Sequence, residues 1–399
     1  MKIFFTTVIL FIFSAVLYAA DGMKMTGVFD STLKLGKTAD SGDSGGEFIY
    51  GIEEYANIRF RGKIGEKAEF YSAFNLIAAS GIQALPIASD INGGAATKIS
   101  AQNYAAAIEL ERLYFRIVNE NTGFDAGLMR LAFGYGSVFS PSDFFNPKNP
   151  LYPDARPRAI LGGLFSFYPN DDSNLRAFAA APPNPFSTSG DGFKAGISGE
   201  RHLKNFSVQS LYVFESPSDT SVSDSATSAP NGVHYFGASI KGDTFVGIWT
   251  DMLYSLNPAT HQNERLQEFS ASAGLDYSLP QLHLYFLFEY LFNGSYSITA
   301  ASAENQNAYR SSHYLYSLTR YNASDFTNIS LSAIFNADDI SFTPIIGFST
   351  SLFQGMTLTL TTQVPLDRSV FDNGSSNGEF GPVQSGLNFL FTVKTEIRF

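Results

Sequence analysis

Three basic residues, Arg59, Arg61 and Lys63, occupy every second position of one short segment. A spacing of two residues places side chains on one face of a β-strand, so these charges form a ladder on a single surface. Three further arginines lie on neighbouring segments: Arg112, Arg116 and Arg130. Rows of fixed charge beside a water-filled passage determine which ions enter it, and this set favours anions. Glu69 and Glu109 offer the alternative that the arginines are paired within the wall.

Catalytic and metal-binding chemistry has little support. The chain has no cysteine, and its five histidines show neither an i, i+4 pair nor an H-E-x-x-H motif, so we expect no metal site and no cofactor. A serine hydrolase would need a histidine beside a serine, and His283 with His313, near Ser311, Ser312 and Ser317, is the available combination. No G-x-S-x-G motif accompanies it, and polar lumen residues explain these positions equally.

The strands that would position these residues are easiest to predict at the carboxyl end of the chain. From Leu387 to Phe399 the odd positions are apolar or neutral, whereas the even positions become charged as the end approaches. This alternation predicts a strand with lipid on one side and water on the other. A soluble edge strand would show a similar pattern.

Residues 1–20 have one lysine, an apolar centre and Ala19-Ala20, which is the layout of a secretory signal peptide. We therefore expect the mature chain to begin near Asp21, with residues 21–399 forming one domain. A retained anchor helix is the alternative. The absence of cysteine fits an exported chain and excludes disulfides and lipid attachment to a cysteine.

The composition narrows the fold class. The formal net charge of −11 argues against nucleic acid as a partner. Charged residues are only 16% of the chain and aromatic residues reach 15%, yet no apolar run after residue 20 is long enough for a membrane helix. An exported, aromatic-rich chain without such a helix can satisfy its backbone in lipid only as a closed antiparallel transmembrane β-barrel.

The sequence also supports this all-β fold through its segments of alternating apolar and polar residues. The connections between these segments are short and long in turn. The expected strands number eighteen, or sixteen if weak segments are miscounted: 23–35, 50–64, 67–78, 105–118, 123–135, 158–168, 174–181, 191–201, 204–215, 232–241, 244–256, 265–278, 281–293, 310–321, 326–335, 339–350, 355–365 and 386–399. One connection, Asn336 to Asp338, is short where a long loop is expected. A soluble sandwich or propeller would leave the aromatic excess unexplained.

One long connection carries the strongest local motif, GLMRLAFGYGSVFSPSDFFNPKNP at residues 127–150. Its prolines and glycines make it stiff, and its phenylalanines give it an apolar face that could seat against a wall. We expect the loop 136–157 to enter the lumen and to place Arg130, Arg156 and Arg158 opposite Arg59 and Arg61. Asp143 would add charge to this constriction, or would cap a turn before a proline.

The motif resembles a segment of porins related to alginate-export and capsule-associated barrels. The resemblance implies an outer-membrane barrel of a Gram-negative-type envelope, and we predict a channel for passive, non-enzymatic diffusion of small hydrophilic solutes. A non-conducting adhesin or structural barrel, and less readily a barrel lipase, are the alternatives. The likeness of the last strand to outer-membrane proteins implies that Phe399, with Ile397, forms an insertion signal read by the barrel assembly machinery. Neither the solute nor the oligomeric state follows from the sequence.

Overall fold

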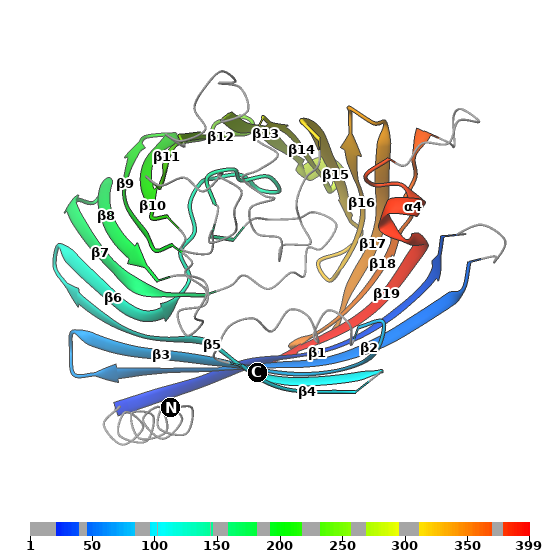
Figure 1. Ribbon diagram of the computed structural model, residues 1–399, viewed down its shortest axis with the longest axis horizontal. Coiled ribbons are helices and arrows are strands. Elements are labelled where there is room, and N and C mark those ends of the chain that lie inside the picture. Colours follow the sequence, from blue (N-terminus) through cyan, green and yellow to red (C-terminus); the bar gives the residue numbers. More distant parts are fainter. Residues whose placement is uncertain are drawn as a thin grey trace, which may run out of the picture.

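The computed structural model is a closed antiparallel β-barrel (Figure 1). It describes residues 21–39, 46–83, 96–101, 103–143, 145–146, 159–181, 192–217, 232–256, 269–294, 311–368 and 378–399. The expected signal peptide and most of the long connections lie outside these ranges. Within them, no helix is long and apolar enough to cross a membrane.

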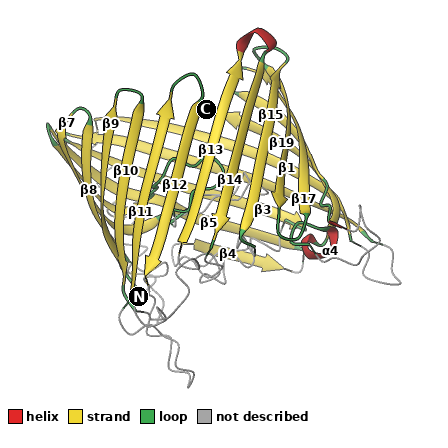
Figure 2. Cartoon of the chain, turned by 90° about the horizontal axis from the view of Figure 1, so that it is seen from above, coloured by secondary structure: helices red, strands yellow, loops and turns green. Residues whose placement is uncertain are grey.

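The described elements are nineteen strands and two short helices. Their bounds are β1 Asp21–Thr38, β2 Phe48–Ile64, β3 Ala68–Gly81, β4 Ala96–Ala101, β5 Tyr104–Asn119, β6 Thr122–Met129, β7 Ile160–Asn170, β8 Ser173–Ala180, β9 Lys194–Leu203, β10 Phe206–Glu215, β11 Val233–Asp243, β12 Gly247–Leu256, β13 Phe269–Leu279, η2 Pro280–Leu282, β14 Leu284–Asn293, β15 His313–Asn322, β16 Thr327–Asn336, β17 Ser341–Phe353, β18 Met356–Gln363, α4 Pro382–Ser385 and β19 Leu387–Arg398. Because β4 pairs only with β5, the closed ring contains eighteen strands, as the sequence predicts. Figure 2 shows the tight turns gathered at one end of the barrel, which we call the short-turn end.

The ring closes where β19 pairs with β1. At the seam, the Gly27 N–H donates to the Phe399 carbonyl at 2.8 Å, and the Phe399 N–H donates back to the Gly27 carbonyl at 3.0 Å. The Phe399 ring covers Gly27 so closely that a Cβ there would lie 2.4 Å from the ring. A residue without a side chain therefore lets the last aromatic ring lie over the first strand.

The strands have two chemically different faces. On β14, Phe288 is 42% exposed on the outer face, whereas the neighbouring Glu289 is fully buried on the inner face. Tyr285, four residues before Glu289 on the same strand, shares this inner face. Outward aromatic side chains and polar inward ones fit a barrel with lipid outside and water inside.

Three differences from the expected strands matter most for the site. The segment expected as 123–135 ends at Met129, because the chain leaves the wall there. An unexpected strand, β4, pairs with the part of β5 that extends beyond β6. Gln281 and His283 belong to the turn around η2, and His283 has a left-handed φ of 54°, so neither begins the inward face of β14.

Candidate functional site

The chain enters the barrel immediately after β6. We call residues 130–143 the inward segment; Figure 1 shows it in teal inside the ring of strands. It crosses to the inner faces of β10, β12 and β14, where its backbone N–H groups donate hydrogen bonds to wall side chains, and the Tyr135 hydroxyl donates to Glu200 on β9. The expectation that this connection folds into the lumen is confirmed for its described part.

Asp251 on β12 is the central anchor of the inward segment. Its carboxylate accepts the Tyr135 N–H at 2.9 Å, the Gly136 N–H at 2.9 Å and the Ser140 hydroxyl at 2.7 Å. The side chain is fully buried. A buried carboxylate is costly unless hydrogen bonds compensate its charge, and these three donors do so.

A second carboxylate, Glu289 on β14, holds the next part of the segment. It accepts the Val138 N–H at 2.8 Å and the Phe139 N–H at 3.1 Å. Ser272 on β13, which lies between the two acidic strands, donates its hydroxyl to the Phe139 carbonyl at 3.0 Å. We call Asp251 and Glu289 the carboxylate clasp, because together they bind four successive or near-successive backbone amides and one hydroxyl of the segment.

Two glycines let the backbone approach the clasp. Gly134 has a φ of +82°, and its N–H donates to the Gln209 side chain at 2.7 Å. A Cβ at Gly134 would lie 2.4 Å from an Asp251 oxygen, and one at Gly136 would lie 1.8 Å from the Phe139 carbonyl oxygen. The GYG sequence is therefore required by geometry as well as by backbone conformation.

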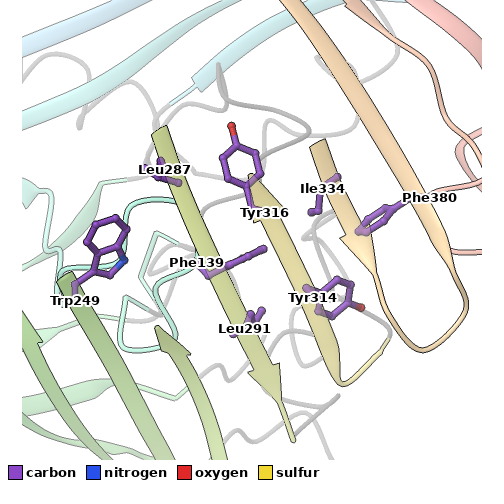
Figure 3. Close-up of a cluster of buried hydrophobic side chains, with 8 residues drawn as sticks. All are labelled: Phe139, Trp249, Leu287, Leu291, Tyr314, Tyr316, Ile334 and Phe380. Atoms are coloured by element: carbon purple, nitrogen blue, oxygen red, sulfur yellow. The ribbon is translucent and has the colours of Figure 1, made fainter. Parts of the chain in front are cut away.

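Apolar contacts complete the attachment. Phe139 is 1% exposed and lies among side chains from β12, β14, β15 and β16 (Figure 3): Trp249, Leu287, Leu291, Tyr314, Tyr316 and Ile334. On the other side of the segment, the Phe133 ring lies 5.1 Å from the Phe178 ring of β8. Leu131 and Phe133 thus bury their side chains inside the barrel rather than facing lipid.

The stretch before β19 also folds onto the inner wall. The Glu379 carboxylate accepts the Tyr314 hydroxyl at 2.6 Å and the Asn336 amide at 2.9 Å. Phe380 joins the same buried cluster as Phe139, with its ring 5.8 Å from the Tyr314 ring. Two stretches far apart in sequence therefore line one continuous part of the lumen wall.

The predicted basic residues of β2 and β5 lie on the wall that these strands form with β3, across the ring from the clasp, and Arg130 adjoins it (Figure 1). Most of them contact a carboxylate: Arg61 with Glu69 at 2.7 Å, Arg112 with Glu111 at 3.2 Å, Arg116 with Asp125 at 2.8 Å, and Arg130 with Glu111. The Arg59 guanidinium donates to the Asn57 side chain, and Lys63 is exposed near the short-turn end. Paired wall charges and a basic surface therefore coexist at this wall.

Arg130 lies beside these arginines rather than opposite them. It follows directly after β6, whose neighbour is β5, so its side chain reaches Glu111 on β5. Burial lowers the pKa of the Arg130 guanidinium from its ordinary value, Arg112 and Arg59 act in the same direction, and the attraction of Glu111 opposes them. The guanidinium remains charged throughout the physiological range.

The remaining residues predicted from the sequence, at the constriction and at the assembly signal, lie in different places. Asp143 is 4% exposed, and its backbone N–H donates to the Ser140 carbonyl at 3.0 Å, which places it in a buried turn. Arg156 and Arg158 lie outside the described residues. Ile397 and Phe399 are both partly exposed, with Ile397 paired to Phe29 across the seam.

The candidate hydrolase pair is not assembled. His283 lies in the turn before β14 at the short-turn end, whereas His313 pairs with Phe292 at the opposite end of that strand. The ten residues of β14 separate them by roughly 30 Å. His313 also accepts or donates a hydrogen bond with the Tyr290 hydroxyl at 2.7 Å. Within the described ranges, no group of three acidic or histidine side chains is placed to hold a metal ion.

The sequence interpretation missed Asp251, Glu289 and Gln209. Each occupies an inward position on an alternating strand, where a polar residue is expected in any water-filled barrel. The available signal was an acidic residue between otherwise small or apolar inward positions, as in the inward pair Trp249 and Leu253 around Asp251. That signal predicts neither that the acidic side chain is buried nor which residues it binds.

Comparisons with known proteins find structural likeness only. No family model and no curated protein matches the chain. The barrel is similar to a BenF-like porin from Pseudomonas fluorescens Pf-5, at 8% identity and a TM-score of 0.58, covering 96% of this chain and 99% of that one. It is also similar to OccAB4 from Acinetobacter baumannii, at 8% identity and 0.55, covering 95% and 98%. The outer membrane protein opdK from Pseudomonas aeruginosa matches at 7% identity and 0.52, covering 94% and 98%. At these identities the likeness establishes a shared barrel fold.

Proposed function

We propose that the protein is an outer-membrane channel for passive diffusion of small hydrophilic solutes. The observation that carries this proposal is the inward segment, which the carboxylate clasp fixes against one wall of a polar-faced barrel. Two fully buried carboxylates hold this segment inside the lumen. A segment held there narrows the passage and so sets its width. The outer-membrane and porin descriptions of similar barrels support the same function and location.

A basic wall facing the clasp favours anions. The clasp carboxylates are buried beneath the inward segment, whereas on the opposite wall Lys63 is exposed and the Arg61 side chain, although paired with Glu69, is 60% exposed. Because exposed charges act on a passing ion more strongly than charges compensated by bound amides, the accessible field is biased towards positive. A dominant basic wall would favour acidic solutes, and this finer assignment is part of the proposal.

Purified protein in planar bilayers is expected to give stepwise current increases, because each inserted barrel adds one passage. Heat-modifiable migration of the same protein on a gel checks in parallel that the barrel is folded. Membranes that stay closed to ions with folded protein inserted would contradict the channel and favour an adhesin or structural barrel.

Replacing Arg59 and Arg61 together by glutamate is expected to move the reversal potential in a salt gradient towards cation preference. The change reverses two charges on the accessible wall and leaves the clasp intact. Lys204→Glu, which changes one charge in the exposed turn between β9 and β10, is the control and is expected to leave the potential near that of the wild type. An unchanged reversal potential in the double variant would show that these two arginines do not determine the ion preference.

The hydrolase alternative loses its structural basis, since His283 and His313 lie at opposite ends of β14. No other observation in the described ranges favours an enzyme.

A further inference from the structure

Two groups of four ring-bearing side chains on the outer face of the barrel share one arrangement. In each group, a Tyr-x-Phe sequence lies near the end of one strand and a histidine lies near the start of the next. A second phenylalanine lies at or just before the start of the preceding strand. We call these groups the first histidine module, on β9 to β11, and the second histidine module, on β13 to β15: Phe193, Tyr212, Phe214 and His234; Phe269, Tyr290, Phe292 and His313.

The two modules have nearly the same geometry. The tyrosine hydroxyl lies 3.0 Å from Nδ1 of His234 in the first module and 2.7 Å from Nδ1 of His313 in the second. In both, the tyrosine and histidine rings stack with their centres 6.1 Å apart. The neighbouring phenylalanine ring lies 5.2 Å from the imidazole in the first module and 5.4 Å in the second. The same local structure is therefore built twice from distant parts of the sequence.

The second module faces away from the lumen. Phe288 is 42% exposed on the outer face of β14, and Tyr290 and Phe292 follow it at every second position. His313 pairs with Phe292, and directly paired residues on antiparallel strands share a face. His313 therefore faces the lipid side of the wall rather than the lumen.

The first module has the same orientation. Gln209 of β10 binds Gly134 inside the barrel, so the alternation of the strand places Phe214 on the outer face. His234 pairs with Phe214 and shares that face. The polar hydrogen bond of each module is therefore made on the outside of the barrel.

The modules lie at the end of the barrel opposite the short-turn end. β10 and β14 each have ten residues and begin after a short turn. A module near the last residues of such a strand lies roughly 30 Å along it. With a strand tilt of about 40°, this length approaches the height of about 25 Å of the apolar band of an outer-membrane barrel, and long loops lie on the outer side. The modules therefore lie at the level of the outer-leaflet headgroups.

The histidines add a polar group that an aromatic girdle does not need. Tyrosine and phenylalanine alone form such a girdle at the membrane boundary. Within the described part of the chain, Nε2 of His234 and Nε2 of His313 bind no residue, and neither atom is fully buried. When the tyrosine hydroxyl donates to Nδ1, the neutral imidazole carries its proton on Nε2. Each module then offers one fixed N–H donor at headgroup level.

We propose that each histidine module binds a phosphate group of an outer-leaflet lipid headgroup, with the Nε2–H donating to a phosphate oxygen. The tyrosine fixes the imidazole, and the phenylalanines pack against the acyl chains and exclude water from this charge-assisted hydrogen bond. A lipid is the occupant because the apolar outer face continues from each module towards the short-turn end, where Phe236 is 47% exposed and Phe288 is 42% exposed. The inference depends on the outer-membrane location and not on conduction through the lumen.

One charge distinguishes the two modules. The Asp338 carboxylate accepts the Ser312 N–H at 2.7 Å and the His313 N–H at 2.9 Å. Among the described residues, no carboxylate binds the main chain of His234 in this way. A negative charge beside the second module repels a phosphate, so the first module is expected to bind the lipid more tightly.

Native mass spectrometry of the detergent-solubilised protein tests the inference. The probes are dioleoyl phosphatidic acid and dioleoylglycerol, which have the same acyl chains and differ by the phosphate. Wild-type protein is expected to bind two molecules of phosphatidic acid more tightly than dioleoylglycerol. His234→Phe keeps a ring and removes the N–H, so it is expected to weaken phosphatidic acid binding at one site by a factor on the order of ten. His313→Phe is expected to act in the same direction by a smaller factor.

His202→Phe is the matched control. Nδ1 of His202 also lies 2.7 Å from a hydroxyl, that of Ser207, but at the short-turn end. This variant is expected to bind phosphatidic acid as the wild type does. Tyr212→Phe, which removes the hydroxyl that fixes the imidazole, is expected to weaken binding less than His234→Phe. Heat-modifiable migration checks that each variant is folded.

Three results would overturn the inference. The first is equal phosphatidic acid binding by wild type and the double variant His234→Phe, His313→Phe, or an equal loss in His202→Phe. The second is displacement of the lipid by inorganic phosphate at equal concentration, which would make the site one for free phosphate. The third is a wild-type oligomer that separates in the double variant without a change in lipid binding, which would assign the modules to contacts between copies. A barrel that passes no current would contradict the channel and leave this measurement unaffected.

Discussion

Single barrels in which Asp251 and Glu289 are both replaced by alanine should carry a clearly larger current than the wild type. The substitutions leave four backbone amides without their acceptors, and the Ser140 hydroxyl keeps only the Phe133 carbonyl. Each buried donor left unpaired costs about 1–3 kcal/mol, so the attached position of the inward segment becomes unfavourable. The ring of strands keeps all its ladder hydrogen bonds. Single-channel conductance measures the opening, and faster hydrogen exchange of the amides at 135–139 locates the change.

A control must remove two lumen carboxylates that do not touch the segment. Glu69 and Glu215 satisfy this condition, since they bind Arg61 and Lys194 respectively. Their double alanine variant is expected to alter ion preference with little change in exchange at 135–139. If the clasp variant retained both wild-type conductance and protected amides, the clasp would not be what fixes the segment.

Deleting Phe399 should sharply lower the yield of heat-modifiable barrel. The deletion removes the reciprocal hydrogen bonds between Phe399 and Gly27 and the ring that covers Gly27, at the one junction where the first and last strands meet. Gly27→Val is expected to act in the same direction and more weakly, because it displaces the ring and keeps the backbone bonds. Gel migration before and after heating measures the folded fraction.

Gly163→Ala is the matched control for the seam. A Cβ at Gly163 on β7 would meet its nearest atoms at 3.9 Å, which is ordinary van der Waals contact. This variant should therefore assemble normally. Full yield from the Phe399 deletion would show that closure does not depend on the terminal residue, and would also count against its role as an insertion signal.

The barrel could be predicted from the sequence because a strand with lipid on one side and water on the other imposes a period of two on its residues. The same rule explains the main error. Residues 130–135 continue the alternation, with apolar side chains at Leu131 and Phe133, so the predicted strand runs on to residue 135 as part of the wall. In the structure both are buried inside the barrel. An apolar side chain gains similarly from lipid and from a lumen cluster, so the pattern alone cannot distinguish the two.

The clasp could not be predicted for a different reason. Asp251 and Glu289 meet the inward segment across sequence separations of 115 and 150 residues. Local pattern identifies both as inward and polar, but their burial depends on where a distant segment comes to rest. By contrast, the basic ladder at Arg59 and Arg61 could be placed on one face, because only the local period is needed. Its pairing with Glu69 depends on the register between β2 and β3.

The clasp binds mainly peptide N–H groups, and every residue except proline has one. Most side chains of the inward segment can therefore change over evolutionary time while its anchoring hydrogen bonds stay the same. The hydrogen bonds themselves constrain Gly134 and Gly136, where a Cβ would collide, and the two wall acids, while the buried clusters constrain Leu131, Phe133 and Phe139. A barrel built in this way can acquire a new solute preference through substitutions such as one at Val138, without first losing the position of the segment that carries them.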